Sequence, residues 1–328
     1  MLDRLQKYGP VISEDQILHF GNHDQEVARG QQTCGLLYLH KVRPFLLQSP
    51  NAKRWCNGMF SNNIRKLQPG QGNRSAICND RGHVQGFIDV YCTDENEFFC
   101  TLEGNDQAWF SKRFGMFMML DDIEMIDLQD VDVISLQGPT AQQVLQTILQ
   151  PPSQPHHHLL HEGIRVARKD RSGNGGFDLF VPQDKGFSIF EQLVAAGAHP
   201  IGAQAINTLR ILSGRARWPE DSTGKSFIHD LVANEECCAF DKGCYVGQEI
   251  INRIDVKGLV NKKLTRIKLS EQVPVGTELY YNNKKVGPIT SRTQYQSEHY
   301  GLAILRKNAW EPGTTLQVQD SSATITTL

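Results

Sequence analysis

The sequence contains no pair of cysteines in the spacing C-x-x-C, although it has eight cysteines. Cys237 and Cys238 are adjacent, and adjacent side chains are poorly placed to bind one zinc ion. The first ten residues, MLDRLQKYGP, contain no apolar segment of the kind found in secretion signals. Cysteines in such a chain indicate reduced thiols and a cytoplasmic protein, not a disulfide framework. We therefore expect no metal site and a cytoplasmic location.

A long apolar run and a strong net charge are also missing. No stretch offers the ~18 consecutive apolar residues of a membrane-spanning helix, so no membrane is expected as a partner. The formal net charge is −2, so DNA is not expected as a partner either. The charge is uneven, because residues 251–328 hold eleven Lys/Arg and six Asp/Glu (+5) while residues 1–250 hold 23 and 30 (−7). A mildly basic C-terminal module either meets an anionic partner or is an ordinary solvated face.

A complete phosphate-binding loop is absent as well. Gly224-Lys225-Ser226 copies the end of a P-loop, but Pro219 stands where that motif has its first glycine. Proline has no amide hydrogen to donate to a phosphate. We therefore do not predict a nucleotide site here.

Predicted strands and helices are mixed in the first part of the chain and do not alternate in a regular βαβ pattern. This favours an α+β fold over a doubly wound sheet. Residues 105–120 show helical spacing, with Trp109, Phe110, Phe114, Phe117 and Met118 on one broad apolar face that is typical of core packing. The other predicted elements are helices at 49–60, 141–149, 187–196 and 202–212 and strands at 84–92, 97–102, 131–136, 164–168 and 177–181.

Two segments divide the chain. PPSQPHHHLLHEG, residues 151–163, is predicted to be a loop that links two halves of the large domain; its histidines are too divergent on an extended loop to predict a metal site. From about Lys262, short strands recur with Gly, Pro and Asn turns, which predicts a small β-barrel or sandwich.

The run KGCYVGQE, residues 242–249, combines groups that could act chemically. Gly243 permits an unusual turn that would hold the thiol of Cys244 at a surface, and the charge of Lys242 would favour the thiolate. Gln248 and Glu249 supply hydrogen-bonding groups for a polar ring system or a neighbouring loop. On chemistry alone, a turn around a buried, inert cysteine explains the run as well.

This octapeptide resembles the signature of the YgfZ family of folate-binding proteins, whose mitochondrial relatives assist iron–sulfur cluster assembly. Other segments resemble, in order, those of the wider group that contains the glycine-cleavage T-protein. They are CGLLYLH (34–40), FSNNIRKLQPGQG (60–72), SLQGP (135–139), SGNGGFDLFVP (172–182) and NTLRILSG (207–214).

The resemblance implies an α+β folate-binding domain of two subdomains, residues 1–250, and a C-terminal β-barrel, residues 256–328, in three lobes around a central cavity. It also implies a bound tetrahydrofolate or derivative. Cys244 would be the reactive or partner-facing residue, within a signature loop that comprises Lys242, Gly243, Tyr245, Gly247, Gln248 and Glu249. The matched segments suggest that Asp178 or Asn174, together with Arg210 and Asn62, bind the cofactor; the alternatives are a hairpin-end residue for Asp178 and a helix-surface charge for Arg210.

One departure from the T-protein pattern bears on activity. T-proteins resemble one another in a G-G-x-x-D-D segment, in which an aspartate assists aminomethyl transfer. Matching that segment to residues 81–86 puts Gln85 and Gly86 where the aspartates would be. Asp89 lies three residues further and, on a strand, is expected to point away from the side of Gly86. Whether the chain is an enzyme is therefore left open.

The function implied by the resemblance is folate-dependent assistance to iron–sulfur cluster assembly or repair, with an indirect effect on tRNA modification. The expected partners are a folate and iron–sulfur assembly proteins or client enzymes, and a monomer is expected. One alternative is a folate-dependent aminomethyltransferase or demethylase, which needs a carboxylate in the cavity. The other is a non-catalytic adaptor that binds no folate.

Overall fold

The computed structural model describes residues 1–14, 16–318 and 324–327. The chain forms two compact units and passes between them repeatedly. Unit 1 comprises Met1–Asn57, Asn63–Arg74 and Ile88–Leu209, and unit 2 comprises Gly58–Asn62, Ser75–Phe87 and Arg210–Leu328. These units do not follow the limits 1–250 and 256–328, which stay a prediction about the modular organisation of the chain.

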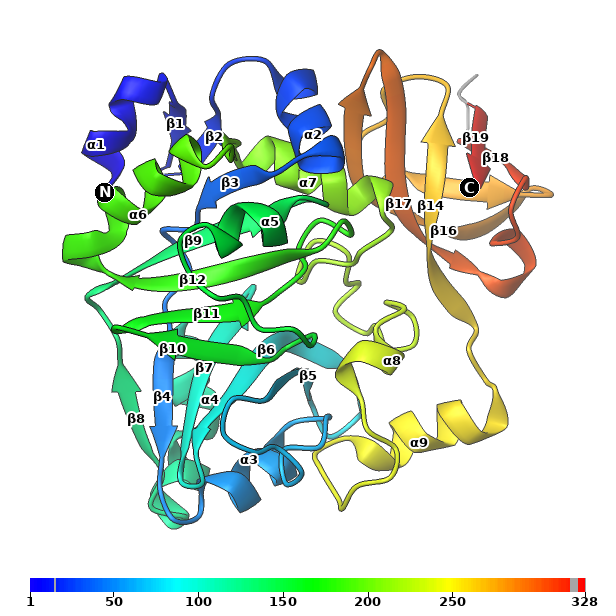
Figure 1. Ribbon diagram of the computed structural model, residues 1–328. Coiled ribbons are helices and arrows are strands. Elements are labelled where there is room, and N and C mark those ends of the chain that lie inside the picture. Colours follow the sequence, from blue (N-terminus) through cyan, green and yellow to red (C-terminus); the bar gives the residue numbers. More distant parts are fainter. Residues whose placement is uncertain (15, 319–323, 328) are drawn as a thin grey trace. The chain divides into compact units, whose positions relative to one another are not determined.

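A six-stranded sheet forms the centre of unit 1 (Figure 1). Its neighbouring strands are antiparallel except for β13, which runs parallel to β3. This mixed, mainly antiparallel sheet confirms the predicted α+β class. In spatial order the strands are β10 (His158–His161), β11 (Ile164–Arg168), β12 (Gly176–Pro182), β9 (Val131–Gln137), β3 (Gly35–Tyr38) and β13 (His199–Pro200).

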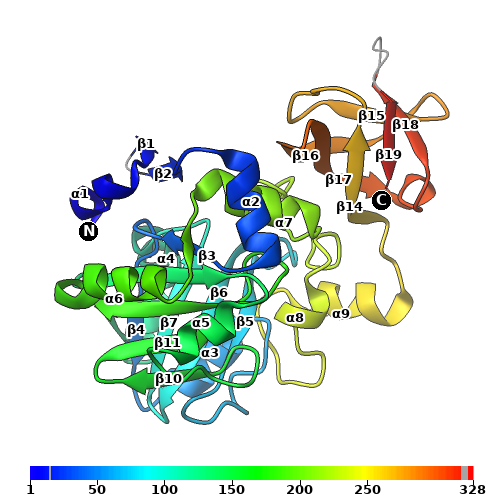
Figure 2. The same cartoon turned by 45° about the horizontal axis from the view of Figure 1, so that its top comes forward.

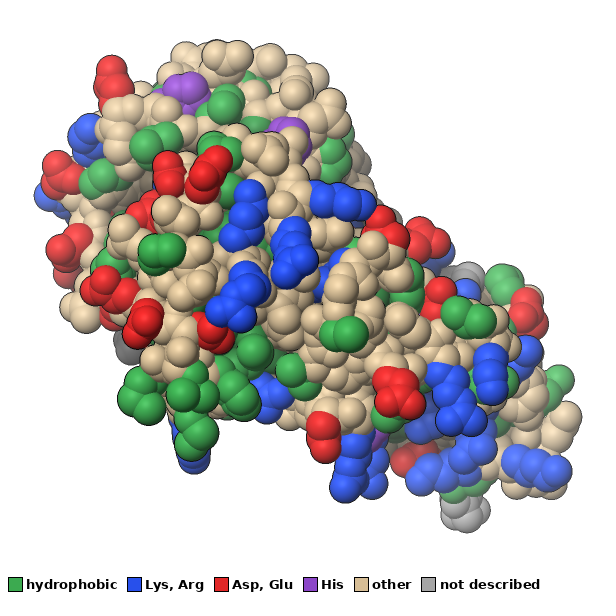
Figure 3. All heavy atoms as spheres, turned by 90° about the horizontal axis from the view of Figure 1, so that it is seen from below, with side chains coloured by type: hydrophobic (Ala, Val, Ile, Leu, Met, Phe, Trp, Pro, Cys, Tyr) green, Lys and Arg blue, Asp and Glu red, His purple; other side chains and the backbone are tan. Residues whose placement is uncertain are grey.

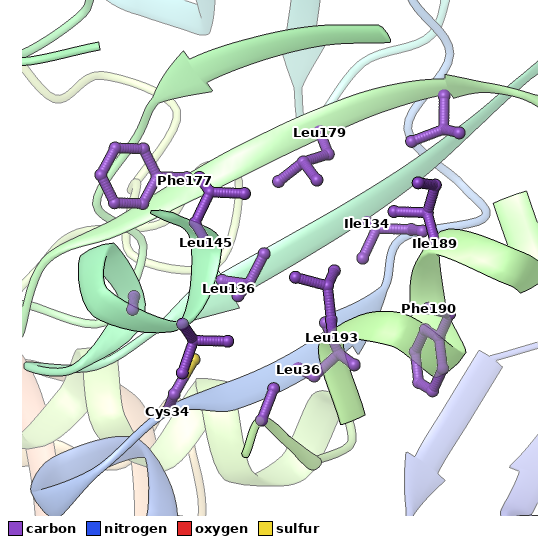
Figure 4. Packing of buried hydrophobic residues seen from close by; sticks show 14 of the residues in the cluster. Cys34, Leu36, Ile134, Leu136, Leu145, Phe177, Leu179, Ile189, Phe190 and Leu193 are labelled. Atoms are coloured by element: carbon purple, nitrogen blue, oxygen red, sulfur yellow. The ribbon is translucent and has the colours of Figure 1, made fainter. Parts of the chain in front are cut away.

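Helices α5 (Ala141–Gln146) and α6 (Gln183–Ala195) cover one face of this sheet. Figure 4 shows side chains of β3, β9 and β12, among them Leu36, Leu136 and Leu179, pointing toward Leu145, Phe190 and Leu193 of the two helices. All of these side chains belong to one cluster in which no buried member exceeds 8% exposure. Their burial supplies most of the hydrophobic driving force of this layer.

A second sheet has five strands, and strands β5 and β6 within it carry residues of both units. Its inner side meets the first sheet through Phe99 on β7 and Phe180 on β12, whose ring centroids lie 4.7 Å apart. In spatial order the strands are β5 (Gly72–Cys78), β6 (Val84–Asp94), β7 (Glu97–Glu103), β4 (Phe45–Gln48) and β8 (Glu124–Asp127).

Helix α4 (Gln107–Leu120) packs against this second sheet and helix α3 (Ala52–Met59). Phe110 stacks obliquely on Phe45 of β4 at 5.1 Å, and Phe114 meets Trp55 of α3 edge-on at 5.6 Å. The predicted apolar face is only partly correct, because Phe117 is 49% exposed. Trp109 is half-buried and lines a pocket described below.

Unit 2 contains a closed six-stranded barrel, as the spacing of the turns predicted (Figure 2). Its interior is apolar and includes Ile267, Leu279, Ile289, Leu305 and Leu316. The strands are β14 (Lys262–Leu269), β15 (Glu278–Tyr281), β16 (Lys284–Tyr295), β17 (Glu298–Arg306), β18 (Thr315–Val318) and β19 (Thr324–Thr327).

The predicted linker 151–163 is not a loop throughout, since residues 158–161 form β10 on the edge of the first sheet. Among the described residues, no helix has the length and apolar character required to cross a membrane. The elements not yet named are α1 (Leu2–Leu5), β1 (Val11–Ser13), β2 (Gln16–His19), α2 (His23–Gln32), α7 (Ala203–Leu212), α8 (Asn234–Cys237) and α9 (Gln248–Lys257), with 3-10 turns at Gln6–Tyr8 and Lys307–Ala309.

Candidate functional site

Unit 1 contains a pocket of about 470 Å³. The volume lies within the range of about 300–1,000 Å³ that is usual for small-molecule sites. The pocket gathers residues from the segment after β3, from β6, from the end of β7 through the turn into α4, and from the loop that precedes β12. Its lining residues are Lys41, Val42, Asp89, Leu102, Glu103, Gly104, Asn105, Asp106, Trp109 and Arg171.

A network of four charges, three of them buried, includes two residues of the pocket wall, Asp89 and Glu103. Asp89 is 3% exposed and accepts hydrogen bonds from Arg74 (3.3 Å to each oxygen) and from the ammonium of Lys169 (2.5 Å). Arg74 also donates to Glu103 at 2.6 Å. Two cations and two anions therefore balance, as buried charges require if they are to remain ionised.

The network determines the protonation of its carboxylates. Burial by itself raises the pKa of Asp89, but the positive charges of Lys169 and Arg74 outweigh it and hold that pKa well below its usual range. The pKa of Glu103 is lowered for the same reason, against the same opposing burial. Both groups are therefore anions at neutral pH, and Asp89 is a weak proton acceptor.

A second ion pair adjoins the pocket. Arg171, which lines it, donates to both carboxylate oxygens of Asp178, with a shortest distance of 2.6 Å. Burial lowers the pKa of Arg171, but the Asp178 carboxylate more than restores it. The pocket thus presents the guanidinium of Arg171, and the carboxylate of Asp178 lies behind it.

Two of the predicted cofactor-binding residues have environments that exclude the alternative roles considered for them. Asp178 is 1% exposed and lies within β12 between Ala167 and Ser135, so it is not a hairpin-end residue. Arg210 is 5% exposed and bonded to Asp221 (2.5 Å) and Ser291 (2.7 Å), so it is not a helix-surface charge. Asn174 is exposed in the turn before β12. Their folate-binding roles stay predictions.

The histidines of residues 156–161 do not converge. His158 is 4% exposed; its Nε2–H donates to the carbonyl of Cys92 (2.9 Å) and its Nδ1 accepts from Arg165 (2.7 Å). Burial, aided by the charge of Arg165, lowers the pKa of His158 to about 4. Across residues 1–14, 16–318 and 324–327, no three His, Cys, Asp or Glu side chains are grouped to hold a metal ion.

The signature loop in unit 2 is anchored at three of its residues. The ammonium of Lys242 donates to the carbonyls of Phe60 (2.6 Å) and Asn62 (2.7 Å) and lies 4.9 Å from the ring centroid of Tyr245. Tyr245 is 6% exposed, and its hydroxyl contacts the sulfur of Cys238 at 3.2 Å. Asn62 thus belongs with the signature loop, and it is not among the residues that line the pocket of unit 1.

Gly247 is the third anchor and is the N-cap residue that precedes α9. It has φ +84°, and a Cβ there would lie 2.5 Å from the carbonyl oxygen of Asn79. Gly243, which was expected to supply the unusual turn, has no such positive φ and has open space around it. The special conformation therefore lies three residues after Cys244, not before it.

Cys244 stands at the exposed tip of the anchored loop, as predicted. The other seven cysteines are buried, and all eight are free thiols. Gln248 donates to the carbonyl of Lys242 (3.4 Å), which closes the loop, while Glu249 is exposed in the first turn of α9, where a negative charge is favourable. The loop therefore presents one accessible thiol on a fixed backbone.

Several residues of the pocket were missed or misread from the sequence. Asp89 was noticed but was not expected to lie in a cavity, and Trp109 was assigned to the core. Arg74, Lys169 and Arg171 gave no signal that separates them from surface cations, because their partners are distant in the chain. A single carboxylate within the apolar run GFIDVYC was the one available sign of a buried ionic site.

Comparison with known proteins identifies the family of this chain. The model of the GCVT N-terminal domain matches residues 6–231. The chain belongs to this family. The model of the CAF17 C-terminal beta-barrel domain matches residues 261–327, which include all six barrel strands. This combination is that of a T-protein-like protein with a CAF17-type barrel.

Individual relatives agree with this family. A putative chloroplastic transferase of Arabidopsis thaliana is 24% identical over 97% of this chain and 76% of its own length. An aminomethyltransferase of Halalkalibacterium halodurans is 23% identical over 92% of this chain and 86% of its own length. The crystal structure of the glycine cleavage system aminomethyltransferase T from Bartonella henselae superposes with a TM-score of 0.89 at 16% identity, covering 99% of this chain and 94% of that one. The chain therefore has the aminomethyltransferase fold.

Proposed function

We propose that this protein is of the YgfZ type, binds tetrahydrofolate or a derivative in the pocket of unit 1, and assists iron–sulfur cluster assembly or repair in the cytoplasm as a monomer. Its effect on tRNA modification is indirect, through enzymes that carry such clusters. The family, the size of the pocket and the exposed thiol of the KGCYVGQE loop support this proposal.

The observation that carries the proposal is the state of Asp89. A general acid–base catalyst works best when its pKa lies near the working pH. The Asp89 carboxylate is engaged by Lys169 and Arg74, which hold its pKa far below neutrality. The residues that stand where T-proteins have their aspartates are Gln85 and Gly86. The pocket is thus suited to binding a folate and poorly suited to proton transfer at it.

Trp109 and Arg171 are the groups that we assign to ligand contact. Trp109 is a half-buried aromatic side chain on the pocket wall, and such a surface can stack on a flat ring system. Arg171 offers its guanidinium to a carbonyl or carboxylate of the ligand while Asp178 holds it in place. The pocket contains both signs of charge, as a ligand with a polar ring and an acidic tail requires.

A folate-dependent aminomethyltransferase or demethylase is the second candidate. Asp89 and Glu103 favour it, because they are carboxylates in the pocket wall. Incubating the protein with tetrahydrofolate and a methylamine donor separates the two proposals. We expect no formation of methylene-tetrahydrofolate above the level without protein, and robust turnover would replace the first proposal by the second.

A substitution of Cys244 tests the proposed role in iron–sulfur cluster assembly or repair. Cys244→Ala is introduced into cells that lack the wild-type protein, and iron–sulfur enzyme activities are measured. Gly243→Ala is the matched control, since it alters the same loop tip where no atom obstructs a Cβ. We expect loss of rescue with Cys244→Ala and full rescue with Gly243→Ala. Full rescue by both variants would leave the thiol with no role beyond loop structure.

A further inference from the structure

A groove of about 460 Å³ lies in unit 2 beside α9. Its apolar wall is formed by Phe227, Ile250, Ile254 and Leu259. Leu259 is 48% exposed, and the other three are half-buried. The groove shares no residue with the pocket of unit 1 and includes none of the residues assigned above to folate or to the thiol loop.

The end of α9 explains why apolar side chains meet at this surface. Gly258 adopts a left-handed conformation (φ +58°); its N–H donates to the carbonyl of Asp255 (3.1 Å), and that of Leu259 donates to Ile254 (3.0 Å). This is the Schellman motif, which brings the side chains of Ile254 and Leu259 together. The contact covers only part of them, since Leu259 remains about half exposed.

The apolar side of helix α9 extends beyond the part that is packed in the core. Its buried residue is Ile251, which belongs to the core cluster of unit 2. Ile254 lies three residues from Ile251 and four from Ile250, so the three isoleucines form one continuous apolar side. Ile250 and Ile254 are only half-buried and line the groove, so the core covers this side incompletely.

Three cations from separate segments surround the apolar wall. Lys225 comes from the loop before Phe227, Arg253 from α9 and Lys262 from the first residue of β14. Within the part of the chain that the structure describes, none of the three forms a salt bridge. Figure 3 shows several Lys and Arg side chains gathered at the lower right of that view, with a few Asp and Glu side chains beside them. The rim of the groove is thus predominantly cationic.

One acid reaches the groove and is already engaged. Asp230 is 7% exposed and accepts the backbone N–H of Phe227 at 3.0 Å. Its own backbone carbonyl accepts from Leu264 at 2.7 Å. Asp230 therefore fixes the loop that carries Lys225 and Phe227. Burial raises the pKa of Asp230 and the charge of Lys262 lowers it, so this carboxylate also faces one of the three rim cations.

We propose that this groove docks a short acidic peptide segment of a partner protein. One large apolar side chain of the segment rests against Ile250, Ile254 and Leu259, and flanking carboxylates meet Arg253, Lys225 and Lys262. The three rim cations, which form no salt bridge among the described residues, and the apolar wall carry this assignment. Charge complementarity at the rim combined with an apolar anchor is how short peptides are recognised. A groove of about 460 Å³ accommodates one or two such anchors.

The test uses the full chain and labelled probe peptides in fluorescence anisotropy. Acidic probes carry a central Phe, Leu or Trp flanked by Glu. Matched probes replace either the Glu residues by Lys or the central residue by Ser. We expect saturable binding of at least one acidic apolar probe. Salt should weaken this binding because it screens the contacts at the rim. The matched probes should not bind at the same concentrations.

Charge reversal then locates the site. Arg253→Glu and, as a second variant, Lys225→Glu should each weaken binding by about 5-fold or more, since an attraction becomes a repulsion. Lys257→Glu is the matched control: the same change on the same helix, at an exposed residue that does not line the groove. We expect it to change binding by less than about 2-fold.

Several outcomes would overturn the proposal. They are no saturable binding of any acidic apolar probe, equal binding when the central residue is Ser, and equal loss of binding with Lys257→Glu. The fatty acid laurate is tested as an apolar anion that is not a peptide, and its binding without binding of the peptides would also overturn the proposal. A dimer that Arg253→Glu dissociates would assign the groove to a second copy of the chain and would count against it equally. Folate is absent from the assay, so the result is independent of the function proposed above.

Discussion

Gly243 and Gly247 stand on either side of the thiol of Cys244, and the structure requires glycine at one of them. At Gly247 a Cβ would lie 2.5 Å from a carbonyl oxygen in a left-handed backbone conformation, whereas Gly243 has open space. We expect Gly247→Ala to lower the free energy of unfolding by about 1–3 kcal/mol, and Gly243→Ala to change it by less than about 0.5 kcal/mol. Urea unfolding of both variants measures this, and equal effects would contradict the assigned geometry.

Asp89 gives a prediction about pH. The pKa of Asp89 is depressed in the folded protein, so the unfolded chain binds the proton of this carboxylate more readily. The stability that Asp89 contributes is therefore fully present above the pKa of an aspartate in the unfolded chain, which is about 4. That stability is lost as the pH falls from about 4 toward the folded pKa, at about 1.4 kcal/mol per pH unit.

The comparison uses Asp89→Asn and, as a control, the exposed residue Glu235→Gln. Unfolding free energies measured between pH 6 and pH 3 should fall less steeply with decreasing pH for Asp89→Asn than for the wild type, and Glu235→Gln should match the wild type. Parallel curves for the wild type and Asp89→Asn would show that this carboxylate is not held ionised by Lys169 and Arg74.

At the scale of elements, helix α4 combines a buried side with an exposed one. Phe114 is 3% exposed and contacts Trp55 and Phe110, whereas Phe117 is 49% exposed on the same helix. Phe114→Ala should therefore cost about 3–5 kcal/mol of unfolding free energy, and Phe117→Ala less than about 1 kcal/mol. Denaturant unfolding of the two variants checks this, and similar losses would mean that Phe117 is also part of a packed interface.

The same helix shows how far the sequence predicts the structure. Apolar periodicity placed α4 and the strands β6, β7, β9, β11 and β12 close to their observed bounds, because period and turn residues are local signals. Which apolar residues are buried depends on neighbours far along the chain, so Trp109 and Phe117 were both assigned to the core. The pocket was missed for a related reason: Asp89 acquires its meaning from Lys169, 80 residues away.

At the scale of the whole molecule, the last strand-rich part of the chain is joined to the preceding segments within unit 2 by a buried polar cluster. Asp221 is fully buried and accepts hydrogen bonds from Arg210, Thr290 (2.6 Å) and Ser291 (2.7 Å), the last two on barrel strand β16. This connects the end of α7 to the barrel. The sequence predicted a folate-binding role for Arg210, which stays a prediction, and gave no sign of its partner Ser291, which is 81 residues away.

Asp221→Ala should destabilise the protein by about 3–5 kcal/mol, because it leaves the buried guanidinium of Arg210 without its counter-charge. Glu220→Ala, in the adjacent exposed pair with Arg217, should cost less than about 1 kcal/mol. Thermal or urea unfolding distinguishes the two, and a small loss with Asp221→Ala would mean that the cluster does not hold the barrel to the rest of unit 2.

Calorimetric titration with tetrahydrofolate tests the central claim most directly. The wild-type protein should bind tetrahydrofolate, Trp109→Ala should bind it about 10-fold more weakly because a stacking surface is lost, and Phe117→Ala, on the same helix outside the pocket, should bind it as the wild type does. Absence of binding to the wild-type protein at micromolar concentration would contradict the account and favour an adaptor that uses no folate.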